Sequence, residues 1–152
     1  CFSSDRHQGL RPIVSPCKLI RGVIAIACIV GVNITANIYG ASAVTYDSRL
    51  DAAAQGHADD MVDRGYFAHE SPEGDDVHDR ILEQGYIPIA WGENLAGRMT
   101  TQEAALREWE NSPAHDTMMN ATSLEEFGLG IAGTGSGTRW VLVMATESQA
   151  TP

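Results

Sequence analysis

The chain has 152 residues, which suits one domain with its own hydrophobic core, and its 43% hydrophobic content excludes an intrinsically disordered chain. Residues 44–152 carry nineteen acids against six Arg and no Lys, so this acidic part has no basic surface with which to bind nucleic acid. All three Cys lie within the first 28 residues, which excludes a disulfide framework, a Cys-based zinc site and a Cys nucleophile from the acidic part.

The first 43 residues, which are net positive, have the pattern of a secretory signal peptide. A basic flank at residues 18–21 precedes the apolar run GVIAIACIVGV at residues 22–32, and ASA follows at residues 41–43. A short apolar run between a basic flank and an A-x-A site is typical of exported proteins, whereas a membrane span needs roughly 20 apolar residues. We therefore expect a secreted or extracytoplasmic protein.

Two fates of this segment stay open. Cleavage after Ala43 would release the acidic part, whereas without cleavage residues 22–39 can form the first helix of the domain. An uncleaved segment would also be the one expected contact with a membrane. The sequence accordingly divides into a targeting segment at residues 1–32, a domain at residues 33–147 and a tail at residues 148–152.

Four helices are expected in the acidic part. Capping boxes at residues 48–51 (SRLD) and 100–103 (TTQE) open the first and the third. Gly65 ends the first because Gly readily takes the left-handed conformation after a helix, and Pro113 breaks the third and begins the fourth. The expected helices cover residues 48–64, 75–84, 100–111 and 113–119.

The apolar period changes to two near the C-terminal end. Apolar residues alternate with other residues in EFGLGIAG and again in TRWVLVMAT, and TGSG lies between these segments. This pattern predicts a β-hairpin. The alternating apolar residues are Phe127, Leu129, Ile131, Trp140, Leu142 and Met144. Helices followed by antiparallel strands predict an α+β domain.

Three polar residues are candidates for a functional site. His69 precedes a β-turn at residues 71–74 (SPEG), His115 follows Pro113, and Glu93 lies in the glycine-flanked segment WGENLAG. Two imidazoles and one carboxylate can bind Zn²⁺ with an open fourth position, or can act as acid and base around a water. Alternatively, they only tie loops to helices through hydrogen bonds. Their wide spacing forms no local metal motif, so both alternatives stay open.

Two further histidines have simpler interpretations. His57 recurs with the apolar residues of the first expected helix, so we expect a hydrogen-bonded residue in or beside the core. His78 lies among Asp75, Asp76 and Asp79, and we expect a solvated helix residue.

Five segments together resemble bacterial members of the CAP superfamily, which groups cysteine-rich secretory, antigen 5 and pathogenesis-related 1 proteins. They are LDAAAQGHADDM, YFAHESPEG, WGENLAG, WENSPAH and FGLGIA…GTRWVLV, in this order between about residues 44 and 146. The resemblance implies a three-layer α-β-α sandwich with a central antiparallel sheet. It also implies secretion, since most such proteins are secreted, and several eukaryotic relatives bind sterols or fatty acids.

The resemblance also implies a pocket with two His and two Glu, where a divalent metal such as Zn²⁺ can bind. His69 matches the first pocket histidine and Glu93 the first glutamate. Ser112 stands at the position of the second glutamate, and residues 135–138 lack the usual second histidine. His115, in the SPxH motif of bacterial relatives, is the expected third member.

These observations favour an exported CAP-type protein that is not an enzyme. Its polar cleft, expected to contain His69, Glu93, His115, Asn94 and Ser71, would bind a small or apolar ligand such as a lipid or sterol, or else a protein partner. The first alternative is a metal-assisted hydrolase that uses His69, Glu93 and His115. The second is a purely structural extracellular module.

Overall fold

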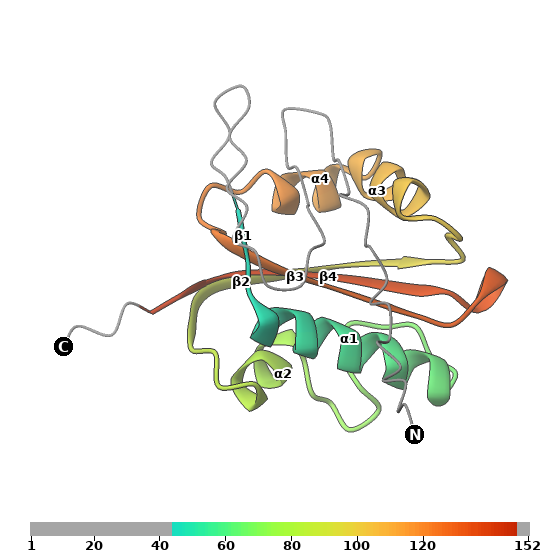
Figure 1. The fold of residues 1–152 in the computed structure, drawn as a ribbon, viewed down its shortest axis with the longest axis horizontal. Helices are drawn as coiled ribbons and strands as arrows, with labels where there is room; N and C mark the ends of the chain where they lie inside the picture. Colours follow the sequence, from blue (N-terminus) through green and yellow to red (C-terminus); the bar gives the residue numbers. More distant parts are fainter. Residues whose placement is uncertain (1–43, 149–152) are drawn as a thin grey trace, which may run out of the picture.

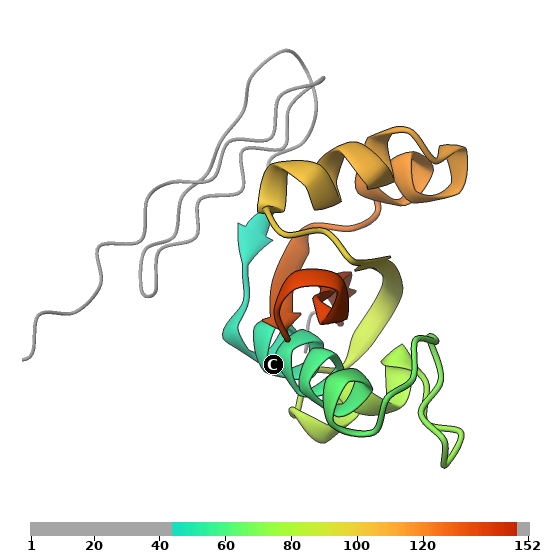
Figure 2. The ribbon, with the colours of Figure 1, turned by 90° about the vertical axis from the view of Figure 1, so that its right-hand side faces the viewer.

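The computed structural model describes residues 44–148, and the expected signal segment and first helix at residues 22–39 lie outside this part. The described residues form three layers, with a sheet between two pairs of helices (Figures 1 and 2). The elements are β1 (Thr45–Tyr46), α1 (Ser48–Asp63), α2 (Val77–Glu83), β2 (Pro88–Gly97), α3 (Gln102–Glu110), α4 (Pro113–Met119), β3 (Glu126–Ala132), a 3₁₀ turn (Gly135–Gly137) and β4 (Arg139–Glu147). Among these elements, no helix is long and apolar enough to span a membrane.

The four predicted helices are present, although two begin one residue away from the predicted cap. Asp47, not Ser48, caps α1, because its carboxylate accepts hydrogen bonds from the two N–H groups of Arg49 and Leu50. The hydroxyl of Thr101, not Thr100, caps α3. The cap is the last residue with an extended backbone before the helix, here Asp47 and Thr101. A sequence motif predicts that a helix begins nearby, but it does not predict which residue keeps the extended backbone.

The sheet has the order β1-β3-β4-β2. The predicted β3–β4 hairpin is confirmed, with Phe127 opposite Met144 and Leu129 opposite Leu142. Two strands were not predicted. β1 pairs in parallel with β3, so the sheet is mixed and not purely antiparallel as expected. β2 pairs antiparallel with β4 along its whole length and forms the other edge of the sheet.

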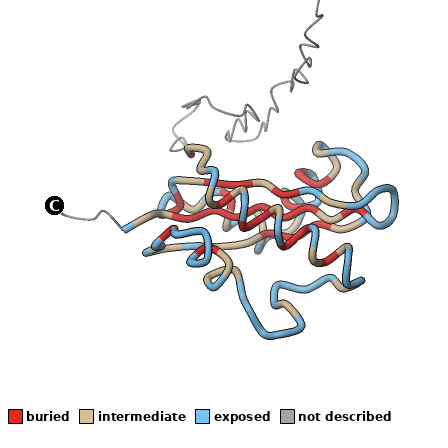
Figure 3. Tube along the Cα trace, turned by 60° about the horizontal axis from the view of Figure 1, so that its bottom comes forward, coloured by how far each residue is buried: buried red, intermediate tan, exposed pale blue. Residues whose placement is uncertain are grey.

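The buried residues gather in the middle of the fold (Figure 3). β4 is buried along most of its length, and the alternation of its side chains divides the core in two. The α3–α4 side contains Trp140, Leu142 and Met144 with Leu106, Trp109 and Phe127. The α1–α2 side contains Val141, Val143 and Ala145 with Leu50, Met61 and Ile81. On α2, Ile81 is fully buried in this second part of the core, whereas its neighbour Leu82 is 42% exposed.

Two glycines let α1 approach β3 closely. A Cβ added at Gly128 would lie 2.0 Å from the backbone nitrogen of Asp51, and one added at Gly130 would lie 2.3 Å from the carbonyl oxygen of Ala54. The side chains of Asp51 and Gln55 then bond the β3 backbone N–H groups of Leu129 and Ile131. The helix therefore packs directly on the strand backbone.

Candidate functional site

The carboxylate of Glu93 lies at the centre of a group that we call the clamp: His69, Arg80 and Glu93. Glu93 comes from β2, Arg80 from α2 and His69 from the loop that joins α1 to α2. Glu93 Oε1 lies 2.8 Å from His69 Nδ1, and Arg80 Nη2 donates to Glu93 Oε2 at 2.8 Å. The side chain of Glu93 is 2% exposed and that of Arg80 11%, whereas His69 is 58% exposed. Both oxygens of a buried carboxylate are therefore engaged.

Arg80 also fixes the loop that carries His69. Its Nη1 donates to the carbonyl oxygen of Asp75 at 2.9 Å, and its Nη2 donates to that of His69 at 3.0 Å. The predicted turn lies between these contacts: the Gly74 N–H donates to the Ser71 carbonyl oxygen at 2.9 Å, and Gly74 has a φ of 97°. The guanidinium thus joins α2, the loop and β2, which makes the clamp a tie between three segments.

Asn94 and His115 lie on the other side of β2. Asn94 follows Glu93 in the strand, and consecutive strand residues point to opposite faces of a sheet. Asn94 Nδ2 donates to the carbonyl oxygen of His115 at 3.1 Å, which fastens α4 to β2. Trp109 Nε1 similarly donates to the carbonyl oxygen of Leu95 at 3.0 Å and fastens α3. Of the predicted cleft residues, the structure brings His69 and Glu93 together, while the side chain of Asn94 bonds the backbone of His115.

The predicted metal set does not converge. Within residues 44–148, the ligand atoms of His69, Glu93 and His115 do not all lie within 4.8 Å of one another. Moreover, the guanidinium of Arg80 is permanently charged and already bonds Glu93 Oε2, an oxygen that a metal ion would need as a ligand. These three residues therefore do not fit a three-ligand metal site in this geometry.

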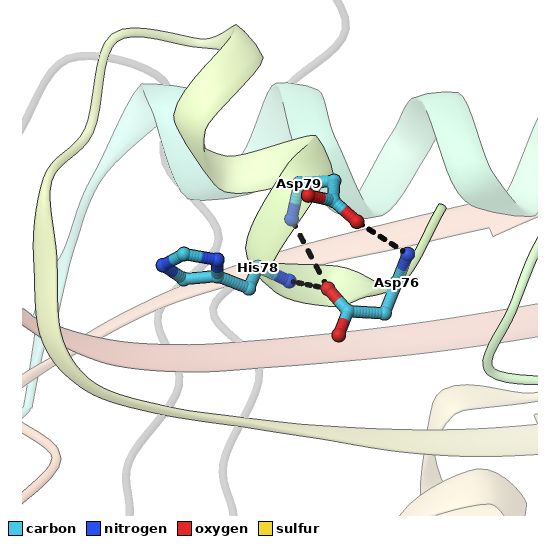
Figure 4. Close-up of side chains that lie close together, drawn as sticks. All are labelled: Asp76, His78 and Asp79. Atoms are coloured by element: carbon cyan, nitrogen blue, oxygen red, sulfur yellow. Dashed lines mark hydrogen bonds between the residues drawn. The ribbon is translucent and has the colours of Figure 1, made fainter. Parts of the chain in front are cut away.

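Asp76, His78 and Asp79 are close enough together to hold an ion, but they cap α2 instead (Figure 4). Asp76 Oδ1 accepts from the N–H groups of His78 at 2.7 Å and Asp79 at 3.1 Å, and Asp79 Oδ2 accepts from the N–H of Asp76 at 3.1 Å. The ring of His78 packs on Trp91 with centroids 4.4 Å apart. His78 is therefore half-buried, contrary to the expected solvated residue, and the cluster is explained as a capping box.

His115 lines an open cleft of about 400 Å³ beside β2, the edge strand of the described sheet, and we call it the β2-edge cleft. Its lining residues are Phe67, Leu95, Ala96, Gly97, Arg98, Glu108, His115 and Arg139. Phe67 and Leu95 supply apolar wall, and Arg98 and Arg139 supply positive charge. The guanidinium carbon of Arg139 lies 5.3 Å from the centroid of the Phe67 ring, a cation–π distance. The cleft can therefore contact both an apolar group and a charged one.

A second cavity, of about 290 Å³, lies between α1, α2 and their connecting loop, and Ser71 is on its wall. His57, 1% exposed, has Nε2 2.9 Å from the carbonyl oxygen of Ala68, so its predicted core role is confirmed. Tyr66 donates to Asp60 Oδ2 at 2.5 Å. Burial lowers the pKa of His57, and burial together with the Asp60 hydrogen bond raises the pKa of Tyr66 to about 12. Ser71 is thus separate from the lining of the β2-edge cleft.

The sequence analysis did not identify the arginines of the clamp and of the β2-edge cleft. They are Arg80 in the clamp, and Arg98 and Arg139 in the cleft. No periodic pattern links Arg80 to Glu93, since the two meet only because the chain folds back between α2 and β2. One signal could have found these residues. In a segment with nineteen acids and six Arg, each Arg is a scarce cation.

The chain is similar to several bacterial proteins. It is 29% identical to the uncharacterized protein YkwD of Bacillus subtilis over 97 residues, which are 64% of this chain and 38% of YkwD. Its structure resembles an extracellular protein containing an SCP domain from Bacillus anthracis, with a TM-score of 0.64 and 26% identity over 69% of this chain and 34% of that one. It shares the fold of an outer surface protein from Borrelia burgdorferi at a TM-score of 0.61 and 19% identity, over 69% of this chain and 78% of that one.

The family assignment rests on a longer match. Residues 6–145 match the model of the CAP family, described as the cysteine-rich secretory protein family. This match includes the clamp and the β2-edge cleft, and the helix–sheet–helix layers agree with the α-β-α sandwich expected from the sequence motifs. The chain therefore belongs to the CAP family.

Proposed function

We propose that this chain is an exported binding module that holds a small ligand in the β2-edge cleft and catalyses no reaction. One observation carries this proposal: both oxygens of Glu93 are engaged, one by His69 and one by Arg80, in a side chain that is 2% exposed. A general base or an open metal site needs a carboxylate that substrate or water can reach. The best-placed acid of the domain is therefore used to hold the fold together, which argues against the metal-assisted hydrolase.

The size and lining of the β2-edge cleft support ligand binding. Small-molecule sites are commonly 300–1,000 Å³ and combine apolar walls with a few polar groups. The cleft, at about 400 Å³, has Phe67 and Leu95 as apolar wall and His115 beside them. Trp109 and Asn94 fasten α3 and α4 to β2, so the cleft is bounded by elements that are tied together. Such preformed walls reduce the ordering cost of binding.

Export is supported by two independent observations. Residues 18–43 have the order of features found in a signal peptide, and the similar B. anthracis protein is described as extracellular. A fusion of residues 1–152 to a periplasmic reporter enzyme tests this part of the proposal. We expect reporter activity that is lost when the apolar run at residues 22–32 is interrupted by two Asp. Activity that survives the interruption would argue against export through this segment.

Ligand binding is tested by NMR with a small-molecule library and the full chain. The indole N–H of Trp109 bonds the Leu95 carbonyl in the cleft wall, so its resonance should shift on binding, while the Trp140 indole, bonded to Met99, is an internal reference. Gly97→Val is the blocking variant, because a Cβ at Gly97 already meets the Phe67 ring at 3.4 Å.

The matched control is Gly137→Val, since nothing lies within 4 Å of a Cβ added there. We expect compounds that shift the Trp109 signal in the wild type and in Gly137→Val but not in Gly97→Val. If no compound shifts that signal, or if Gly97→Val binds equally well, the cleft is not a binding site. The purely structural alternative would then stand.

A further inference from the structure

The described residues leave three arginines without a carboxylate partner. Arg49, Arg64 and Arg80 form ion pairs, whereas within residues 44–148 no carboxylate oxygen lies within 4.0 Å of Arg98, Arg107 or Arg139. Acids outnumber Arg by about three to one here, so unpaired guanidinium groups are unexpected. Two of the three, Arg98 and Arg139, line the β2-edge cleft. The cleft therefore concentrates unpaired positive charge in an otherwise acidic domain.

Arg139 presents donors that its own fold does not fully use. Its Nη1 donates to the carbonyl oxygen of Thr138 at 3.0 Å, and its Nε is buried without a partner in the described part of the chain. His115 Nδ1, on the same cleft, is also buried without a partner there. Buried polar groups in folded proteins are nearly always paired. Arg139 and His115 therefore each keep one unsatisfied polar atom beside the cleft, so the bonds that they make within the fold do not use all of their hydrogen-bonding capacity.

Arg98 adopts a backbone conformation that a side chain disfavours. Its φ is 67°, and among residues 44–148 it is the sole non-glycine residue with positive φ. Its N–H bonds the carbonyl oxygen of Thr138 at 2.9 Å, which holds the end of β2 in this turn. Glycine would take this conformation without strain. Strained positions of this kind cluster at ligand-binding sites, where the side chain is needed.

We infer that the β2-edge cleft binds a small organic monoanion, with its carboxylate on Arg98 and Arg139 and its apolar body against Phe67 and Leu95. A guanidinium matches a carboxylate through two parallel hydrogen bonds. Glu108 also lines the cleft, so the two arginines and this acid leave one net positive charge, which suits a monoanion better than a dianion. This inference rests on the proposed function and names the ligand class of the same cleft.

The test uses benzoate, its neutral analogue benzamide and the dianion phenyl phosphate, each titrated calorimetrically into the full chain. Arg98→Gln removes a cleft charge, and Arg107→Gln is its matched control, because Arg107 is unpaired but lies on α3 outside the cleft lining. We expect benzoate to bind one-to-one and at least about tenfold more tightly than benzamide or phenyl phosphate. Arg98→Gln should weaken benzoate at least about tenfold, and Arg107→Gln less than about twofold.

The possible failures are distinguishable. If benzamide binds as tightly as benzoate and Arg98→Gln changes neither, the anion inference is wrong while the binding module stands. If Arg107→Gln weakens benzoate as much as Arg98→Gln, the attraction is general and the two-arginine site is wrong. If phenyl phosphate binds best, the preference for a monoanion is wrong. Binding of none of the three compounds overturns both the inference and, for ligands of this size, the proposed function.

Discussion

Replacing Arg80 with Met tests whether the clamp holds the fold together. The substitution keeps much of the side-chain volume but removes the charge from Glu93 and the hydrogen bonds to the carbonyl oxygens of His69 and Asp75. Glu93 would then remain 98% buried with only His69 beside it, if its environment stayed as in the wild type. An uncompensated buried carboxylate is one of the costliest local defects in a protein.

The expected magnitude follows from this burial. Breaking a buried ion pair by removing one partner costs about 3–5 kcal/mol. His69 is 58% exposed and still contacts Glu93, so part of the loss is recovered, and we expect the free energy of unfolding to fall by about 3 kcal/mol. The double variant Arg80→Met/Glu93→Gln should be less destabilised than the sum of the single variants, because it leaves no unpaired charge.

The assay is urea unfolding followed by circular dichroism, with Arg64→Met as the matched control. Arg64 also binds a carboxylate through two nitrogens, at 2.6 and 2.7 Å from Glu73, but that pair is exposed to solvent. Exposed pairs contribute little, so Arg64→Met should unfold close to the wild type. Equal losses in Arg80→Met and Arg64→Met, or strictly additive losses in the double variant, would refute the structural role of the clamp.

Three further predictions concern packing, pH and metal. Gly56→Ala should stabilise the protein by about 0.5–1 kcal/mol, because Ala favours a helix more than Gly and nothing lies within 4 Å of the added Cβ. Gly130→Ala should destabilise it by about 3 kcal/mol or more, because the added Cβ would clash with the backbone of α1. Chemical denaturation measures both changes. Burial lowers the pKa of His57 below its usual 6.5, so the unfolded chain binds a proton at this residue before the folded one does. The contribution of His57 to stability should therefore be constant above that pH and decrease as the pH falls below it. Thermal melts of His57→Gln should show a smaller decrease than the wild type, and an equal decrease would contradict the assignment. Calorimetric titration of Zn²⁺ into metal-free protein should show no more one-to-one binding than the double variant His69→Ala/His115→Ala shows. Micromolar binding that is lost in the double variant would support the metal-assisted hydrolase instead.

Local chemistry in the sequence determined much of the fold. The helices, the β3–β4 hairpin, the turn at residues 71–74 and the buried position of His57 all follow from local residue patterns such as caps, turn residues and apolar periodicity. The order of the motifs also predicted the family, and hence the three layers. Neighbouring residues make these contacts in any fold that forms such an element, so a single sequence is enough to predict them.

Only the tertiary structure decided which residues of the candidate site contact one another. β2 was not predicted, because Gly92, Asn94 and Gly97 interrupt the alternation that predicts a strand, and it exists through pairing with β4 about fifty residues later. That pairing places Glu93 and Asn94 on opposite faces, so residues adjacent in the sequence contact different layers. Whether the carboxylate of Glu93 is free or engaged depends on Arg80, which reaches it only when α2 packs beside β2. Such long-range contacts depend on the packing of whole elements, and no local pattern of residues specifies them.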